Sequence, residues 1–138
     1  IQNLTALENV ELPLIYRKVP KAKREELAVN ALEKVGLGHR MDHRPAQMSG
    51  GQQQRVAIAR AIAQAPPIIL ADEPTGNLDS TSTEEIMQIL KDLHKEGRTV
   101  IIITHDNDIA KQAPRRIMIK DGKVESDTKY DHEGGNEE

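Results

Sequence analysis

The strongest constraint on the fold comes from two short apolar runs that flank an amphipathic segment. Residues 68–71 (Ile-Ile-Leu-Ala) and 100–103 (Val-Ile-Ile-Ile) are continuous and rich in β-branched side chains, which is typical of strands covered on both faces. Between them, apolar residues recur at i, i+3, i+4 and i+7, a spacing that predicts one helix. These residues are Ile86, Ile89, Leu90 and Leu93. A strand, a helix and a second strand in this order predict a parallel pair in an α/β fold.

Helical patterns dominate the chain before these strands. Residues 5–8 (Thr-Ala-Leu-Glu) have the spacing of a capping box, and we expect the helix that they start to end by Pro13. A second helix is predicted over residues 25–35, because apolar residues recur there at helical spacing and Gly36 suits the position that follows a helix end. After a loop rich in glycine and proline, a third helix is predicted over residues 52–63.

These patterns divide the chain into three parts. We expect a helical subdomain over residues 1–63 and an α/β part over residues 64–124, in which Asp121-Gly122 is typical of a tight hairpin turn. Residues 125–138 are strongly acidic and almost free of apolar side chains. Such a segment buries too little apolar surface to offset its loss of conformational entropy, so we predict a disordered acidic tail there.

Composition excludes several functional classes. The 138-residue chain has the size of one domain and no cysteine, which excludes a disulfide framework or a thiol nucleophile. Its apolar runs fall far short of the roughly 20 residues that cross a bilayer. With no Phe, no Trp and only two Tyr, single-stranded nucleic acid would find almost no aromatic side chain on which to stack, so no nucleic-acid partner is expected.

Residues 49–52 (Ser-Gly-Gly-Gln) allow two interpretations. Ser49 and Gln52 have the spacing of a capping box for the third helix. A cap does not require Gly50 and Gly51, however, and glycine weakens a helix by up to about 1 kcal/mol relative to alanine. A helix N-terminus with no Cβ in the way also has the properties of a phosphate-contacting turn. Spacing alone leaves both interpretations open.

Three ionisable residues follow the two predicted strands. Asp72 and Glu73 end the first, where ligands bind in open α/β sheets, and adjacent carboxylates there raise each other's pKa unless a cation or proton is shared. A bound metal with a water to activate would resolve this conflict. Pro74 favours an extended backbone at Glu73. His105 follows the second strand and should lie at the same edge of the sheet as Glu73.

At these residues the chain resembles the ATP-binding cassette (ABC) ATPases. Three segments carry the resemblance in order: residues 48–61, which begin Met-Ser-Gly-Gly-Gln-Gln-Gln-Arg; residues 68–79, Ile-Ile-Leu-Ala-Asp-Glu-Pro-Thr-Gly-Asn-Leu-Asp; and residues 104–106, Thr-His-Asp. Residues 4–14 and 76–79 further resemble the subgroup that includes macrolide-exporter and lipoprotein-release ATPases. The resemblance implies part of a P-loop NTPase (RecA-like) core with a mostly parallel sheet, plus an N-terminal helical subdomain that includes the signature helix.

By position, the resemblance assigns a signature motif to Ser49, Gly50, Gly51 and Gln52. In the family this motif contacts the γ-phosphate of ATP held mainly by the opposite subunit of a head-to-tail dimer. Asp79 would be the D-loop residue at the dimer contact. The helical subdomain would receive a coupling helix from a membrane permease, which implies a peripheral location at the inner face of the cell membrane.

The resemblance also assigns the acidic pair and the histidine. Asp72 would be the Walker B carboxylate that holds Mg²⁺ through water, Glu73 the base that polarises the attacking water, and His105 the switch that senses the γ-phosphate. The implied function is an ATP-binding subunit that couples MgATP hydrolysis to transport.

The departures from the family pattern concern the phosphate loop. No Gly-x-x-x-x-Gly-Lys-Ser/Thr occurs, and the aromatic residue that normally stacks on adenine is missing. The chain resembles the C-terminal part of a cassette, with residues 64–124 as the C-terminal part of the ATPase core. We expect it to be inactive alone, and to self-associate or domain-swap because its strands would lack neighbours.

Two alternatives stay open. The chain could be a non-catalytic half-module that lends its signature motif in trans to an ATP-loaded partner. It could also be the C-terminal lobe of a DNA-repair or chromosome-organising ATPase, although the sustained heptads of that group are absent.

Overall fold

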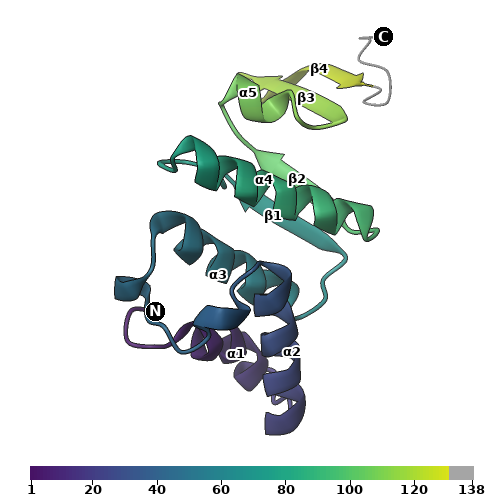
Figure 1. Ribbon diagram of the computed structural model, residues 1–138. Helices are drawn as coiled ribbons and strands as arrows, with labels where there is room; N and C mark the ends of the chain where they lie inside the picture. The colour runs from purple at the N-terminus through teal and green to yellow at the C-terminus, as the bar shows by residue number, and fades with distance from the viewer. Residues whose placement is uncertain (131–138) are drawn as a thin grey trace.

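A computed structural model describes residues 1–130 and has the predicted order of helices followed by an α/β part. Figure 1 shows the N-terminal helices at one end of the molecule, a later helix lying against the parallel strands in the middle and a β-hairpin at the other end. The helical elements are α1 (Ala6–Tyr16), α2 (Lys21–Lys34), the 3-10 turns η1 (Gly38–Arg40) and η2 (Pro45–Gln47), and α3 (Gly50–Ile62). The later elements are β1 (Ile68–Asp72), α4 (Ser80–Lys95), β2 (Thr99–Ile103), α5 (Asn107–Ala110), β3 (Arg115–Lys120) and β4 (Lys123–Lys129).

Helix α1 begins as predicted but ends later. The Thr5 hydroxyl accepts a hydrogen bond from the Glu8 amide at 3.2 Å, and the Thr5 amide donates to the Glu8 carboxylate at 3.1 Å. The prediction that Pro13 ends the helix is wrong, since α1 continues to Tyr16. Proline removes one amide donor and crowds the preceding turn, but the helix continues past it, and the Pro13 carbonyl accepts from the amide of Arg17 at 3.2 Å.

Helix α2 ends as predicted but begins four residues earlier than the periodicity indicated, directly after Pro20. Its first turn is polar and largely exposed, so no apolar pattern marks it in the sequence. At the other end Gly36 takes the left-handed conformation with φ +77°. Its amide donates to the Glu33 carbonyl at 3.0 Å and the Leu37 amide donates to Leu32 at 2.8 Å, which together form a Schellman motif.

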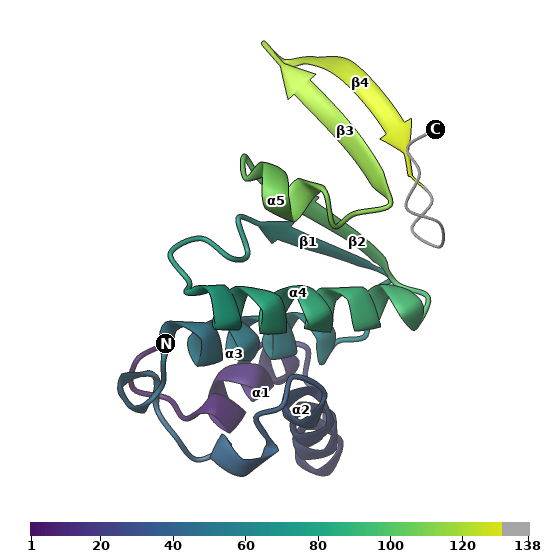
Figure 2. The same cartoon turned by 45° about the horizontal axis from the view of Figure 1, so that its top comes forward.

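The apolar core runs from the helical part into the middle layer. Val10, Leu14 and Leu32 are at most 2% exposed where α1, α2 and α3 pack together. Ile86 and Leu90 continue this core on α4, which contacts both α3 and β2. Figure 2 shows α3 and α4 running side by side between the helical part and the strands. Helix α3 therefore lies between α1 and α2 on one side and α4 on the other.

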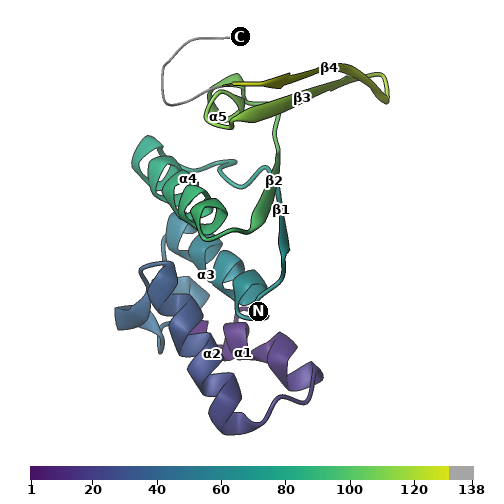
Figure 3. The ribbon, with the colours of Figure 1, turned by 90° about the vertical axis from the view of Figure 1, so that its right-hand side faces the viewer.

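Strands β1 and β2 are parallel, as predicted, with Ile68 opposite Thr99 and Asp72 opposite Ile103. One face of this pair lies on α4, which Figure 3 shows from the side. The expectation that both faces are covered is wrong within the described residues. Leu70 is 70% exposed, and the other exposed apolar residues of these strands are Ile68, Ile101 and Ile103. We call these four residues the open sheet face.

The hairpin β3–β4 turns at the predicted place, where both Asp121 and Gly122 have positive φ. The expectation of disorder from residue 125 is wrong for residues 125–129, which belong to β4. Asp127 is held there by Arg115, whose Nε and Nη2 donate to the carboxylate oxygens at 2.9 and 2.7 Å. The rest of the predicted tail, residues 131–138, lies outside the described residues. Within residues 1–130, every helix is too short or too polar to cross a bilayer.

Candidate functional site

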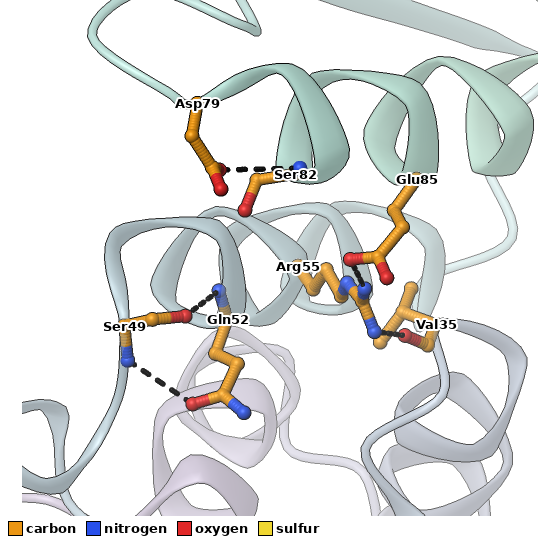
Figure 4. A network of polar contacts seen from close by, with 7 residues as sticks. All are labelled: Val35, Ser49, Gln52, Arg55, Asp79, Ser82 and Glu85. Atoms are coloured by element: carbon orange, nitrogen blue, oxygen red, sulfur yellow. Dashed lines mark hydrogen bonds and ion pairs between the residues drawn. The ribbon is translucent and has the colours of Figure 1, made fainter.

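The turn that starts α3 is built by a capping box. The Ser49 hydroxyl accepts from the Gln52 amide at 3.2 Å, and the Ser49 amide donates to the Gln52 side-chain oxygen at 3.0 Å (Figure 4). Of the two sequence interpretations, the cap is therefore present. The cap does not exclude a phosphate-contacting turn, because capping satisfies only some of the free amides at a helix N-terminus.

Packing explains the glycine at position 51. A Cβ on Gly51 would lie 2.7 Å from the Ser82 hydroxyl oxygen on α4, closer than any real Cβ contact. A Cβ on Gly50 would meet Leu78 at 3.5 Å, an ordinary contact. The sequence offered access for an anion as a reason for both glycines, with the plain cap left open. The structure gives Gly51 a second task, which is to let α3 approach α4.

The N-terminus of α4 lies beside that of α3 (Figure 4). Asp79 is the N-cap, and its carboxylate accepts from the Ser82 amide at 3.2 Å. Hydrogen bonding by Ser82, from its side chain and its amide, lowers the pKa of the Asp79 carboxyl. Ser82 thus contacts Gly51 on one side and Asp79 on the other. Residues 49–52, which we call the signature turn after the motif that the resemblance assigns to them, and Asp79 therefore belong to one packed unit.

Arg55 extends this unit and was missed by the sequence reasoning. Its guanidinium pairs with Glu85 on α4, and Nη1 donates to the Val35 carbonyl at the end of α2 at 3.4 Å (Figure 4). The Arg55 side chain is only 17% exposed. This partly buried arginine on α3 joins three helices, and nothing in the local sequence pattern distinguishes it from a surface arginine.

The second cluster lies where β1 and β2 end. Glu73 and His105 meet there, as the shared sheet edge predicts. Glu73 Oε1 accepts from the His105 amide at 2.9 Å and lies 2.5 Å from the His105 ring atom Nδ1. Thr104 adds a third contact, since its hydroxyl lies 3.1 Å from Glu73 Oε2. The sequence indicated the pair but not this threonine.

Two expectations about Glu73 need correction. We expected the adjacent carboxylates to be in conflict unless a cation or proton is shared. Instead, the pKa of Glu73 is lowered, first by the backbone hydrogen bond from His105 and also by side-chain bonds from His105 and Thr104. We also expected an extended backbone, whereas Glu73 has φ +46°. Its amide donates to the Ile103 carbonyl at 2.7 Å, which holds this left-handed turn against β2.

The chemistry of magnesium fits Asp72 as a ligand. Within residues 1–130 no group of three or more His, Asp or Glu side chains could form a metal cage. Mg²⁺ does not need one, because it keeps several waters and binds through one or two carboxylates together with substrate phosphates. Asp72 is exposed at the end of β1 and offers such a carboxylate.

The two clusters are separate. Among the described residues, no hydrogen bond or ion pair joins residues 49–52 to Glu73 or His105. Each cluster is formed by neighbours in its own part of the fold.

Comparisons with known proteins agree with this architecture. The family model described as ABC transporter matches residues 1–76. An uncharacterised ABC transporter ATP-binding protein of Bacillus subtilis, YvrO, is 54% identical over 131 residues, which cover 95% of this chain and 57% of the relative. The macrolide export ATP-binding/permease protein MacB 2 of Yersinia pestis is 52% identical over 132 residues, covering 96% of this chain and 20% of the relative.

Solved structures give the same result. The dimeric bacterial ABC transporter cassette MJ0796 superposes with a TM-score of 0.78 at 51% identity, covering 94% of this chain and 58% of that one. CbiO1 of Clostridium perfringens, part of the transporter complex cbiONQ, gives a TM-score of 0.82 at 34% identity, covering 89% of this chain and 50% of that one. The match thus covers between 50% and 58% of the length of the two cassettes and of YvrO.

These matches confirm the α/β fold class and the subgroup resemblance drawn from the sequence. The chain belongs to the ABC transporter ATP-binding family.

Proposed function

We propose that this chain is part of the ATP-binding subunit of an ABC transporter that couples MgATP hydrolysis to transport through a membrane permease. The contact between Glu73 and His105 carries the proposal most directly. At the end of two parallel strands, a carboxylate can polarise a water molecule, and an imidazole beside it can contact a phosphoryl group as charge develops on it during transfer.

Each site residue has a proposed role. Glu73 acts as the base for the attacking water, His105 contacts the γ-phosphate, and Asp72 holds Mg²⁺ through water. The ion would neutralise charge that develops on the phosphates. The supporting observation is that the pKa of Glu73 is lowered. The carboxylate therefore stays ionised and can accept a hydrogen bond from the attacking water.

The signature turn has a proposed role in a second subunit's site. The turn at Ser49 lies in a different cluster from Glu73, which suits a head-to-tail dimer in which residues 49–52 contact ATP held mainly by the partner. The amides of Gly50 and Gly51 and the positive end of the α3 dipole would meet the γ-phosphate. Asp79, packed against the same unit through Ser82, would lie at the dimer contact.

We further propose that the helical subdomain, residues 1–63, receives a coupling helix from the permease. The subunit would then lie at the inner face of the cell membrane without entering it. Support comes from the relatives, whose names describe ATP-binding proteins of transporters and, for MacB, a joined permease.

Glutamine at position 73 tests the catalytic assignment. In an ATPase assembled from this chain and a polypeptide that carries a Gly-x-x-x-x-Gly-Lys-Ser/Thr loop, Glu73→Gln should lower kcat by at least about 100-fold, because general bases contribute factors of this size. Glu84→Gln, on the exposed side of α4, is the matched control and should leave kcat unchanged. Equal rates for wild type and Glu73→Gln would contradict the assignment.

A non-catalytic half-module remains the second candidate. It is favoured by the signature turn, which is capped and packed by α3 and α4 without help from the Glu73 cluster. ATP-dependent binding of this chain to an intact cassette, with no hydrolysis that depends on Glu73, would support this candidate over the catalytic one.

A further inference from the structure

Thr104 lies between Glu73 and the start of α5 and contacts both. Its hydroxyl oxygen is 3.1 Å from Glu73 Oε2 and 3.0 Å from the amide nitrogen of Asp106. The residue follows β2 directly, so its backbone is fixed by the strand that pairs with β1.

The protons that each group carries determine which atom donates and which accepts in these two hydrogen bonds. A backbone amide can only donate, so the Thr104 hydroxyl accepts from Asp106. An ionised carboxylate can only accept, so the single hydroxyl proton points at Glu73 Oε2. Because threonine is branched at Cβ, its side chain is restricted about χ1, and this arrangement has few competing rotamers.

The other end of this chain of bonds is anchored in the core. Asp106 caps α5 by accepting from the amides of Asp108 at 2.8 Å and Ile109 at 3.3 Å. Ile109 is 4% exposed and belongs to the apolar core. Thr104 therefore connects the Glu73 carboxylate to a buried anchor, whereas the His105 side chain is 92% exposed and has no such support from burial.

Glu73 needs this support. A non-glycine residue at φ +46° lies in a sparsely populated and strained region of backbone conformation, which persists only where the surroundings over-determine it. The amide bond to Ile103 fixes the backbone of Glu73, but it does not orient the carboxylate. Among residues 1–130, only contacts from residues 104 and 105 reach the carboxylate oxygens.

We propose that Thr104 is a positioning residue for Glu73. Its hydroxyl holds the carboxylate against His105 before any nucleotide is present, so the base is oriented in advance of substrate binding. The relevance of this placement to hydrolysis rests on the function proposed above, but the placement itself does not.

Amide hydrogen exchange of the 138-residue chain, measured by NMR without nucleotide, tests the proposal. The readout is the His105 amide, which donates to Glu73 Oε1 at 2.9 Å. Thr104→Val keeps the branched shape and removes the hydroxyl, and it should speed exchange of this amide roughly 2- to 10-fold, the factor expected for loss of one hydrogen bond. Thr104→Ser restores the hydroxyl and should bring exchange back to within about twofold of wild type.

Two further variants calibrate the measurement. Glu73→Ala removes the acceptor and sets the fastest exchange expected for His105. Thr99→Val, at the opposite end of the same strand, is the matched control and should leave the His105 amide unchanged. Retained protection of the Ile109 amide shows that α5 is intact. If Thr104→Val fails to fold, Thr104→Ala replaces it with the same expected result.

The proposal is overturned if the valine or alanine variant exchanges like wild type while Glu73→Ala exchanges faster. It is also overturned if Thr104→Ser does not restore protection, or if Glu73→Ala itself has no effect. Because no nucleotide is used, a failure of the ATPase assay would leave this readout unaffected, so the two proposals fail separately.

Discussion

At the scale of single residues, glycine and serine define how the signature turn is held. Gly50 and Gly51 are adjacent in sequence, yet only Gly51 faces a neighbour that excludes a side chain. The two adjacent glycines therefore have different reasons to lack a side chain. One position is free to approach a ligand, and the other fixes the distance between two helices.

This difference predicts opposite effects of alanine at the two positions. Gly51→Ala should lower the free energy of unfolding by about 1–3 kcal/mol, because the new Cβ overlaps Ser82. Gly50→Ala should be neutral or should stabilise by up to about 1 kcal/mol, since alanine favours the helix and its Cβ meets only an ordinary contact. Urea denaturation followed by circular dichroism measures both.

Ser82→Gly provides the control for Gly51→Ala. The atoms that would clash are the Ser82 Cβ and Oγ, so the double variant should recover part of the lost stability. Additive losses in the double variant would show that the clash is not the cause.

Residue-level prediction from sequence succeeded in placing Glu73 beside His105 and failed for the backbone conformation of Glu73. Glu73 and His105 could be paired because parallel strands place their ends together. The left-handed backbone of Glu73 could not be predicted, because Pro74 favours an extended conformation in the residue before it. The hydrogen bond from the Glu73 amide to the Ile103 carbonyl outweighs this local preference. Thr104 and Arg55 were missed because their partners are distant in sequence.

At the scale of elements, the boundaries that the sequence predicts correctly are those marked by helix caps and glycines. The capping box at Thr5 and the Schellman motif at Gly36 are local in sequence and were identified correctly. The end of α1 and the extent of β4 depend on tertiary or cross-strand contacts. Leu14 is buried one residue after Pro13, and Asp127 is paired with Arg115 across the hairpin, so local rules placed both boundaries wrongly.

The helix caps also predict how stability depends on acidity. The backbone bond from Thr5, then the Thr5 side chain, lowers the pKa of Glu8, and Ser82 lowers that of Asp79. A carboxyl whose pKa is lower in the folded state stabilises the fold above its unfolded pKa, and this contribution is lost as the pH falls through the folded pKa. The free energy of unfolding should therefore be level from pH 7 to about 5 and fall below about pH 4.

Glu8→Gln isolates the contribution of α1. Glutamine keeps the capping bond but cannot ionise, so the fall in stability at low pH should be shallower than in wild type. Urea denaturation at a series of pH values from 7 to 3 measures the two curves. Parallel curves, or stability that rises on acidification, would contradict the assignment.

At the scale of the whole molecule, the open sheet face leaves apolar side chains of the parallel strands β1 and β2 exposed. Its four residues, Ile68, Leu70, Ile101 and Ile103, are each at least 44% exposed. Apolar strand runs predicted burial on both faces, and the described residues cover only one. The sequence thus predicted the pattern correctly, but the cover for the second face is not supplied by residues 1–130.

We therefore expect this chain by itself to self-associate or domain-swap through that face. Sedimentation velocity at increasing concentration should show species larger than a monomer. Replacing Leu70 with lysine and Ile101 with glutamate puts opposite charges on directly paired positions and should shift the chain toward monomer. Tyr16→Ser, which removes an exposed apolar group from α1, is the control and should change little. A wild-type monomer at all concentrations that melts cooperatively would contradict this expectation.

The claim on which the account depends most is that this chain provides a base and a signature turn to a nucleotide site that it does not complete alone. Phosphate release from ATP, measured with Mg²⁺ for the chain alone and for the chain co-assembled with a polypeptide carrying the Gly-x-x-x-x-Gly-Lys-Ser/Thr loop, tests it most directly. We predict negligible release by the chain alone and Mg²⁺-dependent release by the assembly. Mg²⁺-dependent turnover by the chain alone that Glu73→Gln abolishes, or an assembly that stays inactive although both parts are folded and bound, would contradict it.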